Sequence, residues 1–409
     1  MTDSFPTRIS FAQAQQLIAD VAAAHRHDAE RVPLSRASGR VLAEELVATT
    51  PLPGFDNSAM DGFALRGDEG IAPRRLIGEQ FAGIAQAFSV GSGQCLRITT
   101  GARMPEGADA VLMKENARIE GEFVIPMQAI KPGTHVRKQG EDVAVGDRVL
   151  ERGIALNASQ LSLAAALGQH DLTVYRKPTV AIFTTGDELR APGQPLAPGE
   201  IYDSNRVLLQ TLLIAEGFEP VAWLVLPDHP ETIAGALRDA AFSFDVVLTC
   251  GGVSAGEKDH LPEFLRREGQ IHFWKVLMRP GMPLLFGKLG DAHFLGLPGN
   301  PVSVLATFLT LARQLLDGLQ GLGTPRPTLR ARLSADISKT HDRREFLRGL
   351  LSCDEHGQLQ VQPNPADGSH RLLAAAQSNA LIVLAEGAGR WRVGDIVEVL
   401  AYAGFRAPR

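Results

Sequence analysis

The fold is decided by a stretch whose clearest pieces are PTVAIFTTGDEL (178–189), FDVVLTCGG (244–252) and HFLGLPGNPVSVLATFLTLARQLLDGL (293–319). Each piece contains a short apolar run that ends in a turn rich in glycine and polar residues. Capped helical patterns lie between these runs, in SNRVLLQTLLIAEGF, ETIAGALRDAAF and DHLPEFLRREG. Apolar strands that alternate with helices form parallel sheets covered on both faces. The block from Lys177 to Gly323 is therefore predicted to be a doubly wound α/β domain.

The sequence on either side of this block has a different pattern. Near the N-terminus, FAQAQQLIADVAAAH repeats apolar residues at helical spacing behind Ser10, a plausible N-cap, and residues 157–170 also have a helical pattern. We expect these two helices to pack together as a separate element. In residues 65–151 and again in residues 328–402, short apolar runs are split by glycine and proline. These two regions are predicted to be β-rich, the second as a small barrel or sandwich.

Composition excludes several function classes. The chain has 409 residues, a net charge of −5 and 6% aromatic residues, and it lacks the basic stripe and stacking aromatics of nucleic-acid-binding proteins. Its cysteines, Cys95, Cys250 and Cys353, form neither a metal-binding pair nor an even disulfide set, which indicates a reducing compartment. MTDSFPTRIS is not patterned as a signal peptide, and no apolar run approaches the roughly 20 residues of a membrane span. We therefore expect a cytoplasmic protein that binds neither nucleic acid nor membrane.

Unusual residues follow the predicted strands of the α/β block. The first strand is followed by Asp187 and Glu188, the third by GGVSAGEKD (251–259), and the last by PGNPVS (298–303). Ligands of open α/β sheets bind outside the carboxyl ends of the strands, so these segments are expected to line one crevice. Carboxylates that converge repel one another unless a cation is present, which favours bound Mg²⁺. A solvated acidic rim is the competing interpretation.

Segment 251–259 has the features of a phosphate-binding loop. Gly251 and Gly252, with Ser254, would let backbone N–H groups approach a phosphate. Lys258 could neutralise an anion, and Asp259 could hold Mg²⁺ through oxygen. The alternative is a glycine-rich turn that carries an exposed ion pair.

Polar residues at two helix starts have a simpler explanation. Asn300 is a candidate N-cap and Pro301 occupies the favoured first helical position. Asp203 or Ser204 could cap the helix that they open. Capping accounts for these residues, so a second role, in which N–H groups near Asn300 bind phosphate, stays open.

Other candidates lie in turns outside these strand ends. PGFDNSAMDGFA (53–64), which contains Asp61, and ITTGA, which contains Thr100, read as tight turns that could also supply oxygen donors. Lys275 and Arg279, in KVLMRPGMP, are either anion contacts or part of a solvated basic rim.

The histidines do not indicate a catalytic or metal site. His25 and His27 are two apart on a predicted helix, so they do not share a face. We expect both at the surface, and no Ser–His–Asp or Cys–His arrangement can be assigned.

Taken together, these segments resemble those of the molybdopterin molybdenumtransferase family, which includes MoeA and the gephyrin E domain. The shared strings cover essentially the whole chain in the family's order: PGFDNSAMDGFA, RITTGA, GEDV, TTGDEL, YDSNRVLL, TCGGVSAGEKDH, KVLMRPGMP, GLPGNPVS, REFLRG and GSH. Several of the strings are long, so the resemblance is specific.

The resemblance implies an α/β and β multidomain fold that forms an elongated homodimer. Its parts would be a MogA-like doubly wound α/β domain, a β-rich N-terminal domain, a helical and extended linking domain, and a C-terminal β-barrel. The expected boundaries are 1–49 plus 146–176 for the linking domain, 50–145 for the β-rich domain, 177–326 for the MogA-like molybdopterin-binding domain and 327–409 for the barrel.

The resemblance also implies a reaction, the insertion of molybdate into adenylylated molybdopterin with release of AMP, assisted by Mg²⁺ or another divalent cation. The implied catalytic residues are Asp61, Thr100, Asp187, Glu188, Asp259 and Lys275. The implied cofactor-binding residues are Gly251, Gly252, Ser254, Lys258, Asp228, Arg137, Arg279, Pro298, Asn300, Pro301, Arg348 and Ser369. The implied metal ligands are Glu188, Asp142 and Asp259.

The implied partners are a second copy of the chain and, transiently, the molybdopterin adenylyltransferase. Asp61, Thr100, Arg137 and Asp142 would face the crevice from the β-rich domain of the partner subunit. Such a site needs no covalent nucleophile, which agrees with the lack of a triad.

One segment departs from the family pattern. The family often reads K-P-G-K-P where this chain has Arg279, Pro280, Gly281, Met282 and Pro283. Arginine keeps the charge but changes its geometry and hydration, and methionine removes a charge. A paralogue with an altered oxyanion preference, such as tungstate, therefore stays open. A non-catalytic molybdopterin-binding or scaffold protein stays open as well, because some members of the family cluster membrane receptors. A different nucleotide-cleaving enzyme on the same α/β domain is a third.

Overall fold

The computed structural model describes residues 5–83, 87–223, 225–254, 259–366 and 368–404. The chain divides into two compact units. One unit comprises residues 1–30 and 175–409, and the other comprises residues 31–174.

The first unit is built around a seven-stranded sheet with the order β1-β19-β21-β22-β18-β14-β17. Its strands are β1 (Thr7–Ile9), β14 (Val180–Thr184), β17 (Val221–Ala222), β18 (Val246–Cys250), β19 (Gln270–Val276), β21 (Leu285–Leu289) and β22 (Ala292–Leu297). The strands β22, β18, β14 and β17 run parallel, as predicted. The sequence predicts a sheet that is parallel throughout, whereas β21 is antiparallel to β19 and β22. Only Gly290 and Asp291 connect β21 to β22, and a two-residue connection joins antiparallel strands.

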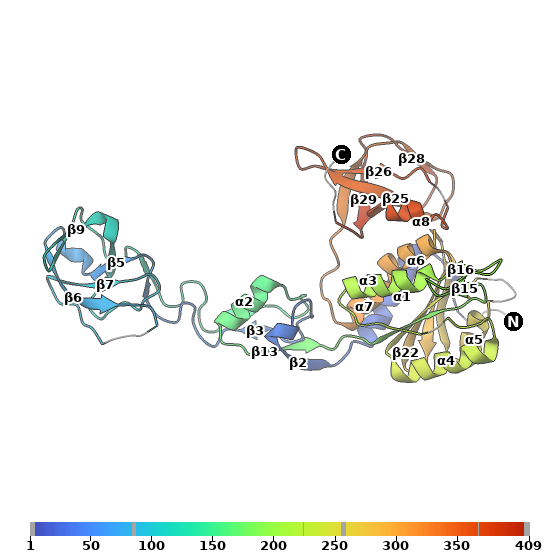
Figure 1. Cartoon of the computed structure of the whole chain (residues 1–409), viewed down its shortest axis with the longest axis horizontal. Coiled ribbons are helices and arrows are strands. Elements are labelled where there is room, and N and C mark those ends of the chain that lie inside the picture. Colours follow the sequence, from blue (N-terminus) through green and yellow to red (C-terminus); the bar gives the residue numbers. More distant parts are fainter. Residues whose placement is uncertain (1–4, 84–86, 224, 255–258, 367, 405–409) are drawn as a thin grey trace. The chain divides into compact units, whose positions relative to one another are not determined.

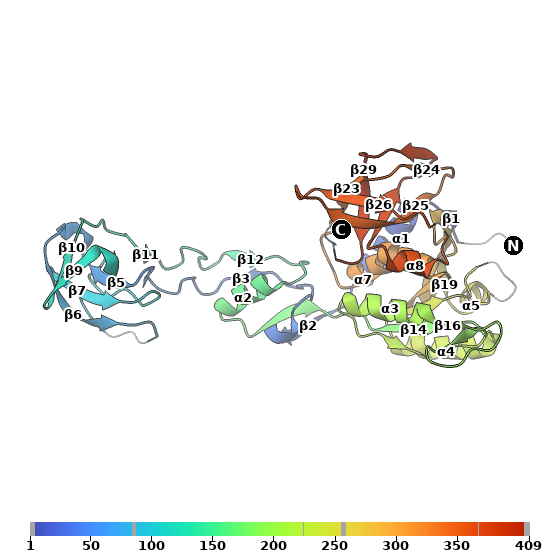
Figure 2. The same ribbon diagram turned by 45° about the horizontal axis from the view of Figure 1, so that its top comes forward.

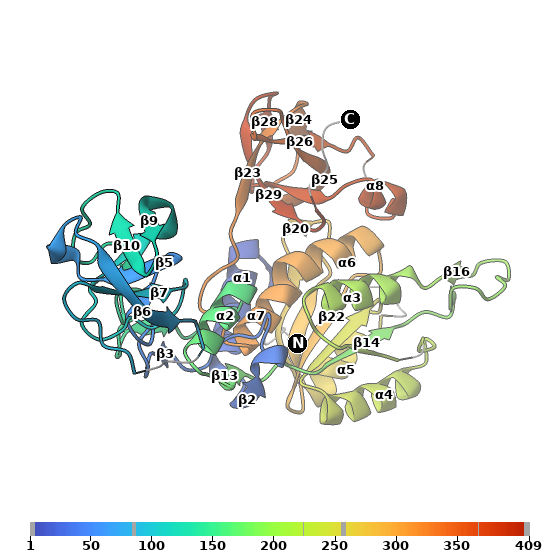
Figure 3. The same ribbon diagram turned by 60° about the vertical axis from the view of Figure 1, so that its left-hand side comes forward.

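Helices cover both faces of this sheet (Figure 1, Figure 3). One face carries α1 (Phe11–Ala24), α3 (Ser204–Ala215), α6 (Pro301–Thr307), the π-helix η4 (Phe308–Ala312) and α7 (Arg313–Leu319), and the other carries α4 (Pro230–Ser243) and α5 (Leu261–Glu268). Ile182 packs into the first core and Phe183 into the second, because successive residues of a strand face opposite sides. Both faces are buried, which explains why the strands read as continuous apolar runs.

The N-terminal helix belongs to this unit. The Ser10 hydroxyl accepts a hydrogen bond from the backbone N–H of Gln13 in a capping box, which confirms the predicted cap. The apolar face of α1, with Ile18 and Ala22, is buried in the core beside α7, and β1 pairs with β19. The expectation that α1 packs with the helix at 157–170 is therefore wrong, and residues 1–30 group with the α/β domain rather than with the linking domain.

The helical run Pro301–Leu319 is long and apolar enough to cross a membrane, with a mean hydropathy of 1.3. The expectation that no run approaches a membrane span is therefore too strong. However, 78% of the apolar window is buried inside the protein. A Cβ at Gly318 would lie 2.5 Å from the Cβ of Ala22, so the run is packed tightly against α1 as a core helix.

The C-terminal part of the first unit is a closed five-stranded barrel. It contains β23 (Leu329–Leu333), β25 (Arg344–Cys353), β26 (Leu359–Pro363), β27 (Ala380–Leu384) and β29 (Ile396–Ala401). The ring closes because β25 pairs with both β26 and β27, which resolves the expected barrel or sandwich as a barrel. Four further elements are β20 (Met278–Arg279), which pairs with β25, β24 (Ile337–Lys339), its partner β28 (Gly389–Trp391), and α8 (Leu372–Ala376).

The second unit is β-rich, as predicted. Its six-stranded sheet has the order β8-β5-β7-β6-β10-β9 (Figure 2). These strands are β5 (Gly62–Leu65), β6 (Arg74–Gln80), β7 (Gln94–Ile98), β8 (Ala110–Met113), β9 (Ala117–Glu120) and β10 (Phe123–Pro126). The remaining elements are β2 (Ala29–Pro33), β3 (Leu46–Val47), β4 (Asn57–Ser58), β11 (Val136–Arg137), β12 (Arg148–Leu150), α2 (Ala158–Ala166), β13 (Asp171–Tyr175) and three short 3₁₀ turns, η1 (Leu34–Arg36), η2 (Gly67–Glu69) and η3 (Lys114–Asn116).

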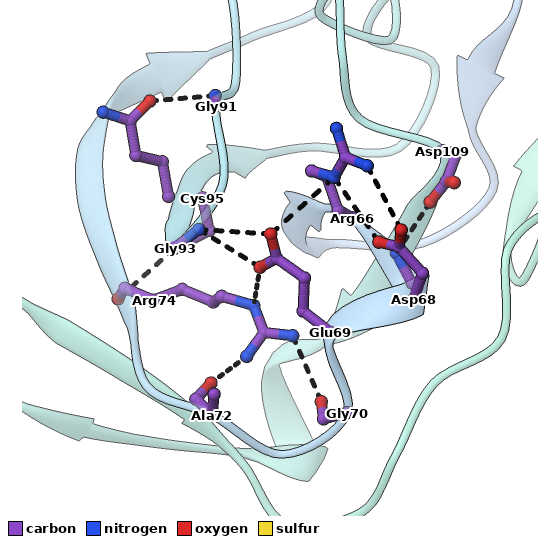
Figure 4. A network of polar contacts seen from close by, with 12 residues as sticks. Arg66, Asp68, Glu69, Gly70, Ala72, Arg74, Gly91, Gly93, Cys95 and Asp109 are labelled. Atoms are coloured by element: carbon purple, nitrogen blue, oxygen red, sulfur yellow. Dashed lines mark hydrogen bonds and ion pairs between the residues drawn. The ribbon is translucent and has the colours of Figure 1, made fainter.

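A buried arginine organises one end of this six-stranded sheet (Figure 4). The side chain of Arg74 is fully buried, and its Nε lies 3.0 Å from the Glu69 carboxylate. Its guanidinium also donates to the carbonyls of Gly70 and Ala72, and the Glu69 carboxylate accepts from the N–H of Gly93. Removing one partner of such a buried pair destabilises a protein by about 3–5 kcal/mol, so this network serves the fold.

Candidate active site

A cavity of about 460 Å³ lies at the carboxyl ends of the central parallel strands. It is formed by the turns that follow β14, β18 and β22, by the start of α3 and by the segment before α8. Seven of the residues predicted for the site line it: Gly251, Gly252, Glu188, Asp228, Asp259, Asn300 and Pro301. The carboxyl ends of the parallel strands thus form a cavity, and these seven residues lie in its wall.

The turn after β18 requires glycine for geometric reasons. Gly251 has φ 93° and Gly252 has φ 68°, a region that L-residues with a side chain rarely adopt. A Cβ on Gly251 would lie 3.0 Å from the hydroxyl of Thr185, and one on Gly252 would lie 3.1 Å from the Leu261 side chain. The two glycines therefore bring bare backbone to the cavity wall, as a phosphate-binding turn needs.

The turn after β14 places two neighbouring carboxylates differently. Glu188 lines the cavity, and its carboxylate folds back so closely that a Cβ on Gly186 would lie 2.7 Å from Oε2. The Asp187 carboxylate instead accepts a hydrogen bond from the backbone N–H of Asp228 at 3.0 Å, and Asp187 is not among the described residues of the lining. Asp187 thus ties two strand-end loops together and positions Asp228.

Two polar atoms at the cavity have no partner in the part of the chain that the structure describes. They are the hydroxyl of Thr185 and the side-chain oxygen of Asn205, and both are buried. The Asn205 amide nitrogen donates to the carbonyl of Gly299 at 2.6 Å, which fixes its side chain against the turn after β22. An unsatisfied buried polar group costs about 1–3 kcal/mol, so both atoms are candidate ligand contacts.

The two helix starts at the cavity are capped differently. Asp203 is buried, caps α3 by accepting from the N–H of Arg206 at 3.1 Å, and accepts from the hydroxyl of Thr184 at 2.7 Å. The capping interpretation is therefore confirmed for Asp203. Asn300 occupies the N-cap position of α6, but its side chain makes no capping hydrogen bond with the described residues around it. Capping does not account for the Asn300 side chain.

The described lining of this cavity is acidic. It includes the carboxylates of Glu188, Asp203, Asp228 and Asp259, and it includes no lysine or arginine. Two like charges 4 Å apart repel by about 4 kcal/mol at an effective dielectric constant of 20. An anionic ligand at this wall therefore needs a cation beside it. Lys258, the predicted anion contact, lies outside the described residues.

The carboxylates fit a loosely held Mg²⁺ rather than a complete protein cage. Within the described ranges, no group of three or more His, Cys, Asp or Glu side chains is close enough to hold a metal ion. Mg²⁺ is usually bound through one or two carboxylates, water and substrate phosphates. Glu188, Asp228 and Asp259 could supply one or two such ligands.

Several predicted residues lie outside the described lining. The Lys275 ammonium sits 4.1 Å from the centroid of the Trp274 ring, and Arg279 Nε lies 3.5 Å from the carboxylate of Glu345, whose side chain is 6% exposed. Ser254 is exposed, and Pro298 is buried at the end of β22. Their predicted ligand roles stay predictions.

The C-terminal part contributes through the turn that precedes α8. The buried Arg348 guanidinium donates to the carbonyls of Gly368, at 2.9 Å, and Ala366. The carbonyl of Ser369 accepts from the N–H of Val302 in α6 at 3.2 Å. The next residue, His370, lines the cavity. Arg348 thus holds the turn that brings the C-terminal part to the cavity, and its implied cofactor-binding role stays a prediction.

Five residues for which no ligand role was predicted also line the cavity: Thr185, Tyr202, Asn205, His370 and Leu372. The signal was present for most of them. Tyr202 and Asn205 lie in the string YDSN, and His370 lies in the string GSH. Thr185 precedes Gly186 at a strand end.

The second unit brings its predicted residues together in pairs. One Asp61 oxygen accepts both the N–H and the hydroxyl of Thr100, each at 2.8 Å, and these hydrogen bonds lower the pKa of Asp61. Arg137 and Asp142 line a separate cavity of about 530 Å³ beside Leu52.

The two histidines expected at the surface differ in environment. The His27 side chain is 9% exposed, and its Nε2 lies 3.8 Å from the carboxylate of Asp245. The His25 ring meets the buried His293 ring edge-on at 5.1 Å. The surface expectation is therefore wrong for His27, because the chain after α1 places its ring beside Asp245, just before the central strand β18.

Comparisons with known proteins agree with this architecture. Family models match the chain in order: "MoeA N-terminal region (domain I and II)" over residues 9–168, "Probable molybdopterin binding domain" over residues 181–318, and "MoeA C-terminal region (domain IV)" over residues 330–402.

Individual proteins match over nearly the whole chain. A molybdopterin molybdenumtransferase of Haemophilus influenzae is 39% identical over 375 residues, which cover 90% of this chain and 93% of that protein. Gephyrin of Dictyostelium discoideum is 30% identical, with 91% of this chain and 59% of that protein covered. A molybdopterin biosynthesis MoeA protein of Pyrococcus horikoshii has a solved structure with a TM-score of 0.82 at 29% identity, with 97% of this chain and 100% of that chain covered. The chain belongs to the molybdopterin molybdenumtransferase family.

Proposed function

We propose that the chain is a molybdopterin molybdenumtransferase, an enzyme of molybdenum-cofactor biosynthesis that inserts molybdate into adenylylated molybdopterin and releases AMP. One observation carries this proposal within the family. Glycine backbone, carboxylates and two buried polar atoms without described partners meet in one cavity at the carboxyl ends of the parallel strands.

The cavity residues divide the work of binding a phosphoanhydride. The turn at Gly251 and Gly252 offers backbone to the phosphates, and Asn300 presents a side chain that capping does not use. Glu188, Asp228 and Asp259 would hold the divalent cation, for which Mg²⁺ is our choice. When bound, that cation supplies the positive charge that offsets the charge on the leaving AMP.

We further propose that the active form is a homodimer. In this proposal, the β-rich domain supplies Asp61, Thr100, Arg137 and Asp142 to the cavity of the partner subunit. Arg137 would add positive charge at a wall whose described lining has no lysine or arginine. A monomer in light scattering that retains full activity would refute this shared site.

The other finer predictions keep the status of proposals. The predicted domain boundaries are 1–49 plus 146–176, 50–145, 177–326 and 327–409, and we keep them except that residues 1–30 leave the linking domain. A cytoplasmic location and transient contact with the molybdopterin adenylyltransferase that supplies the substrate are also proposals.

An altered oxyanion preference is the second candidate function. The observation that favours it is the ion pair between Arg279 and Glu345, which draws the Arg279 charge toward the barrel, together with methionine at position 282. Tungstate should then replace molybdate at equal or higher rate in the same assay. No such observation favours a non-catalytic scaffold.

The test is AMP release from adenylylated molybdopterin in the presence of Mg²⁺, measured with and without molybdate. Release that requires molybdate, and that a chelator abolishes, would support the proposal. Tight pterin binding without any release under either condition would sink it and favour a scaffold or storage protein.

A further inference from the structure

Three large apolar side chains lie exposed on the rim of the acidic cavity. Ile201 is 55% exposed, Tyr202 is 45% exposed and Leu372 is 43% exposed, and all three line the cavity. Single exposed apolar residues need no explanation, but apolar side chains that gather at a binding cavity mark a contact for a ligand. We call Ile201, Tyr202 and Leu372 the rim ledge.

The backbone under the rim ledge is held firmly. Two short parallel strands, β15 (Leu189–Arg190) and β16 (Ile201–Tyr202), pair directly after the Glu188 turn. The N–H of Ile201 donates to the carbonyl of Glu188 at 2.8 Å. The guanidinium of Arg190 and the carboxylate of Glu200 lie 2.5 Å apart. Figure 3 shows β16 and its loop projecting outward past α3 and β14. The part of the ledge made by Ile201 and Tyr202 is therefore preformed at a fixed place relative to Glu188.

The Tyr202 ring is also fixed before any ligand binds. Its hydroxyl donates to the carbonyl of Gln194 at 3.0 Å, so the polar end of the side chain already has a partner. What Tyr202 can offer to the cavity is its ring. Aromatic rings stack on flat heterocycles in offset or edge-to-face geometry, and a ring that is immobilised in advance loses little entropy on binding.

We propose that the rim ledge binds a planar heteroaromatic ring of the substrate while the phosphates lie against the glycine turn and the carboxylates. The proposal rests on the proposed function, because adenylylated molybdopterin carries two such rings, an adenine and a pterin. The cavity has matching parts: an apolar rim, an acidic wall, and the Thr185 hydroxyl and Asn205 oxygen, which can exchange hydrogen bonds with a polar ring edge. Tyr202 is thus a specificity-determining residue for the ring.

The experiment is calorimetric titration of the full chain in Mg²⁺ with three probes: AMP, a phosphorylated pterin, and inorganic pyrophosphate, which has no ring. The variants are Tyr202→Ala and Tyr202→Phe, with Phe242→Ala as matched control. Phe242 is a 94% exposed aromatic residue of α4 and is not part of the described lining. Stacking of one base on an aromatic side chain is lost on alanine substitution with a roughly tenfold or larger fall in affinity.

We expect Tyr202→Ala to bind one ring-bearing probe about tenfold more weakly, while Phe242→Ala stays within about twofold of wild type. Tyr202→Phe keeps the ring but loses the hydrogen bond to Gln194, so its affinity should fall less than that of Tyr202→Ala, by at most about fivefold. Pyrophosphate affinity should be unchanged in every variant. The probe that loses affinity identifies the ring on the ledge, the adenine or the pterin. Undiminished binding of both rings by Tyr202→Ala, an equal loss for pyrophosphate, or no binding of either ring by wild type would overturn the proposal.

Activity separates this proposal from the proposed function. If wild type releases AMP in a molybdate-dependent way and Tyr202→Ala binds both rings normally, the ring-binding proposal is wrong and the proposed function stands. If Tyr202→Ala binds a ring more weakly but wild type never releases AMP, the ring-binding proposal stands and the proposed function is wrong.

Discussion

At the amino end of the seven-stranded sheet, Asp245 is surrounded by partners from its own chain. Its carboxylate accepts two hydrogen bonds from the Arg176 guanidinium, at 2.8 and 2.9 Å, and two from Thr179, both at 2.7 Å. Burial alone would raise the pKa of Asp245, but the hydrogen bonds from Arg176 and Thr179 outweigh burial and hold the pKa well below its usual range. At the carboxyl end, Glu188, Asp228 and Asp259 line a cavity whose described wall has no lysine or arginine.

The difference separates charges that serve the fold from charges that serve the ligand. A carboxylate satisfied by its own chain stabilises the folded state and has little left to offer a substrate. A carboxylate in an acidic cavity destabilises the free protein unless a cation arrives. In the proposal made above, substrate, metal and a second copy of the chain would complete the carboxyl-end cavity. Changes at the amino end should affect stability, and changes at the carboxyl end should affect activity.

The largest effect is expected for Glu188→Gln. The change keeps the shape and removes the charge, so we expect the rate of molybdate-dependent AMP release to fall by about 100-fold or more. The melting temperature should stay the same or rise, because one repelling charge has left the cavity. Steady-state kinetics and calorimetry on the same preparation measure both. A variant with activity within a few-fold of wild type would break the comparison at the carboxyl end.

Asp245→Asn should show the opposite pattern. The amide cannot keep all four of the hydrogen bonds that the carboxylate accepts, and it cannot pair with the Arg176 charge. We expect the free energy of unfolding to fall by about 2–3 kcal/mol, as for the loss of charge-assisted hydrogen bonds. The kcat/KM for AMP release should remain within about twofold of wild type, since this end of the sheet is far from the strand ends that line the cavity. Urea denaturation gives the first quantity, and an unchanged midpoint would contradict the assignment.

The pH dependence of stability sharpens the same contrast. Burial lowers the pKa of His293 to about 4, with a smaller contribution from the charge of His25, and burial also lowers the pKa of His27. The side chains of Lys288 and His272 act on His293 in the same direction. An unfolded histidine binds a proton below about pH 6.5, so the unfolded state binds more protons than the folded state between about pH 6.5 and 4. Stability is therefore lost as the pH falls through this window.

We expect the loss between pH 6.5 and 4 to be about 3 kcal/mol from His293. Replacement of His293 by glutamine should flatten the profile in this range without changing the part below pH 4, where carboxylates such as Asp245 become protonated. Denaturant titrations at half-unit steps of pH give the profile. An identical slope in wild type and His293→Gln would contradict the assignment.

The smallest expected effect comes from a matched pair of threonines. The hydroxyls of Thr185 and Thr249 are both buried without a partner in the described residues, but only Thr185 lines the cavity. Valine has the same shape without the polar atom, so either substitution should leave stability unchanged or raise it by about 1 kcal/mol. Thr185→Val should in addition weaken the binding of a ring-bearing probe, AMP or the phosphorylated pterin, about fivefold, the cost of about 1 kcal/mol for one hydrogen bond. Equal binding by the two variants would remove Thr185 from the ligand contacts.

The sequence was sufficient for features that depend on local rules. Ser10 and Asp203 could be predicted as caps because a side chain and its own helix determine a cap, and Gly251, Gly252 and Glu188 could be placed at a cavity because parallel strand ends share one edge. The packing partner of α1 could not be predicted, because an amphipathic pattern shows which face of a helix is buried but not which element covers it.

Whether a buried polar atom has a hydrogen-bond partner depends on the folded structure. For this reason no ligand role could be predicted for Asn205 or Thr185 from the sequence. The resemblance assigned Lys275 and Arg279 to the crevice, while the structure places the first on Trp274 and the second beside Glu345. The surface expectation for His27 failed for the same reason as the partner of α1, because a two-residue spacing on one helix says nothing about what the chain covers after the helix ends.

The central claim is that groups from a second copy complete the carboxyl-end cavity. It is tested most directly by coexpressing Glu188→Gln and Arg137→Ala chains with different tags and purifying the mixed dimer. Each variant alone should be nearly inactive. If Arg137 acts in the cavity of the partner subunit, one site of the mixed dimer is intact, and AMP release should recover to about half the wild-type rate per dimer. A mixed dimer as inactive as its parents would contradict the claim.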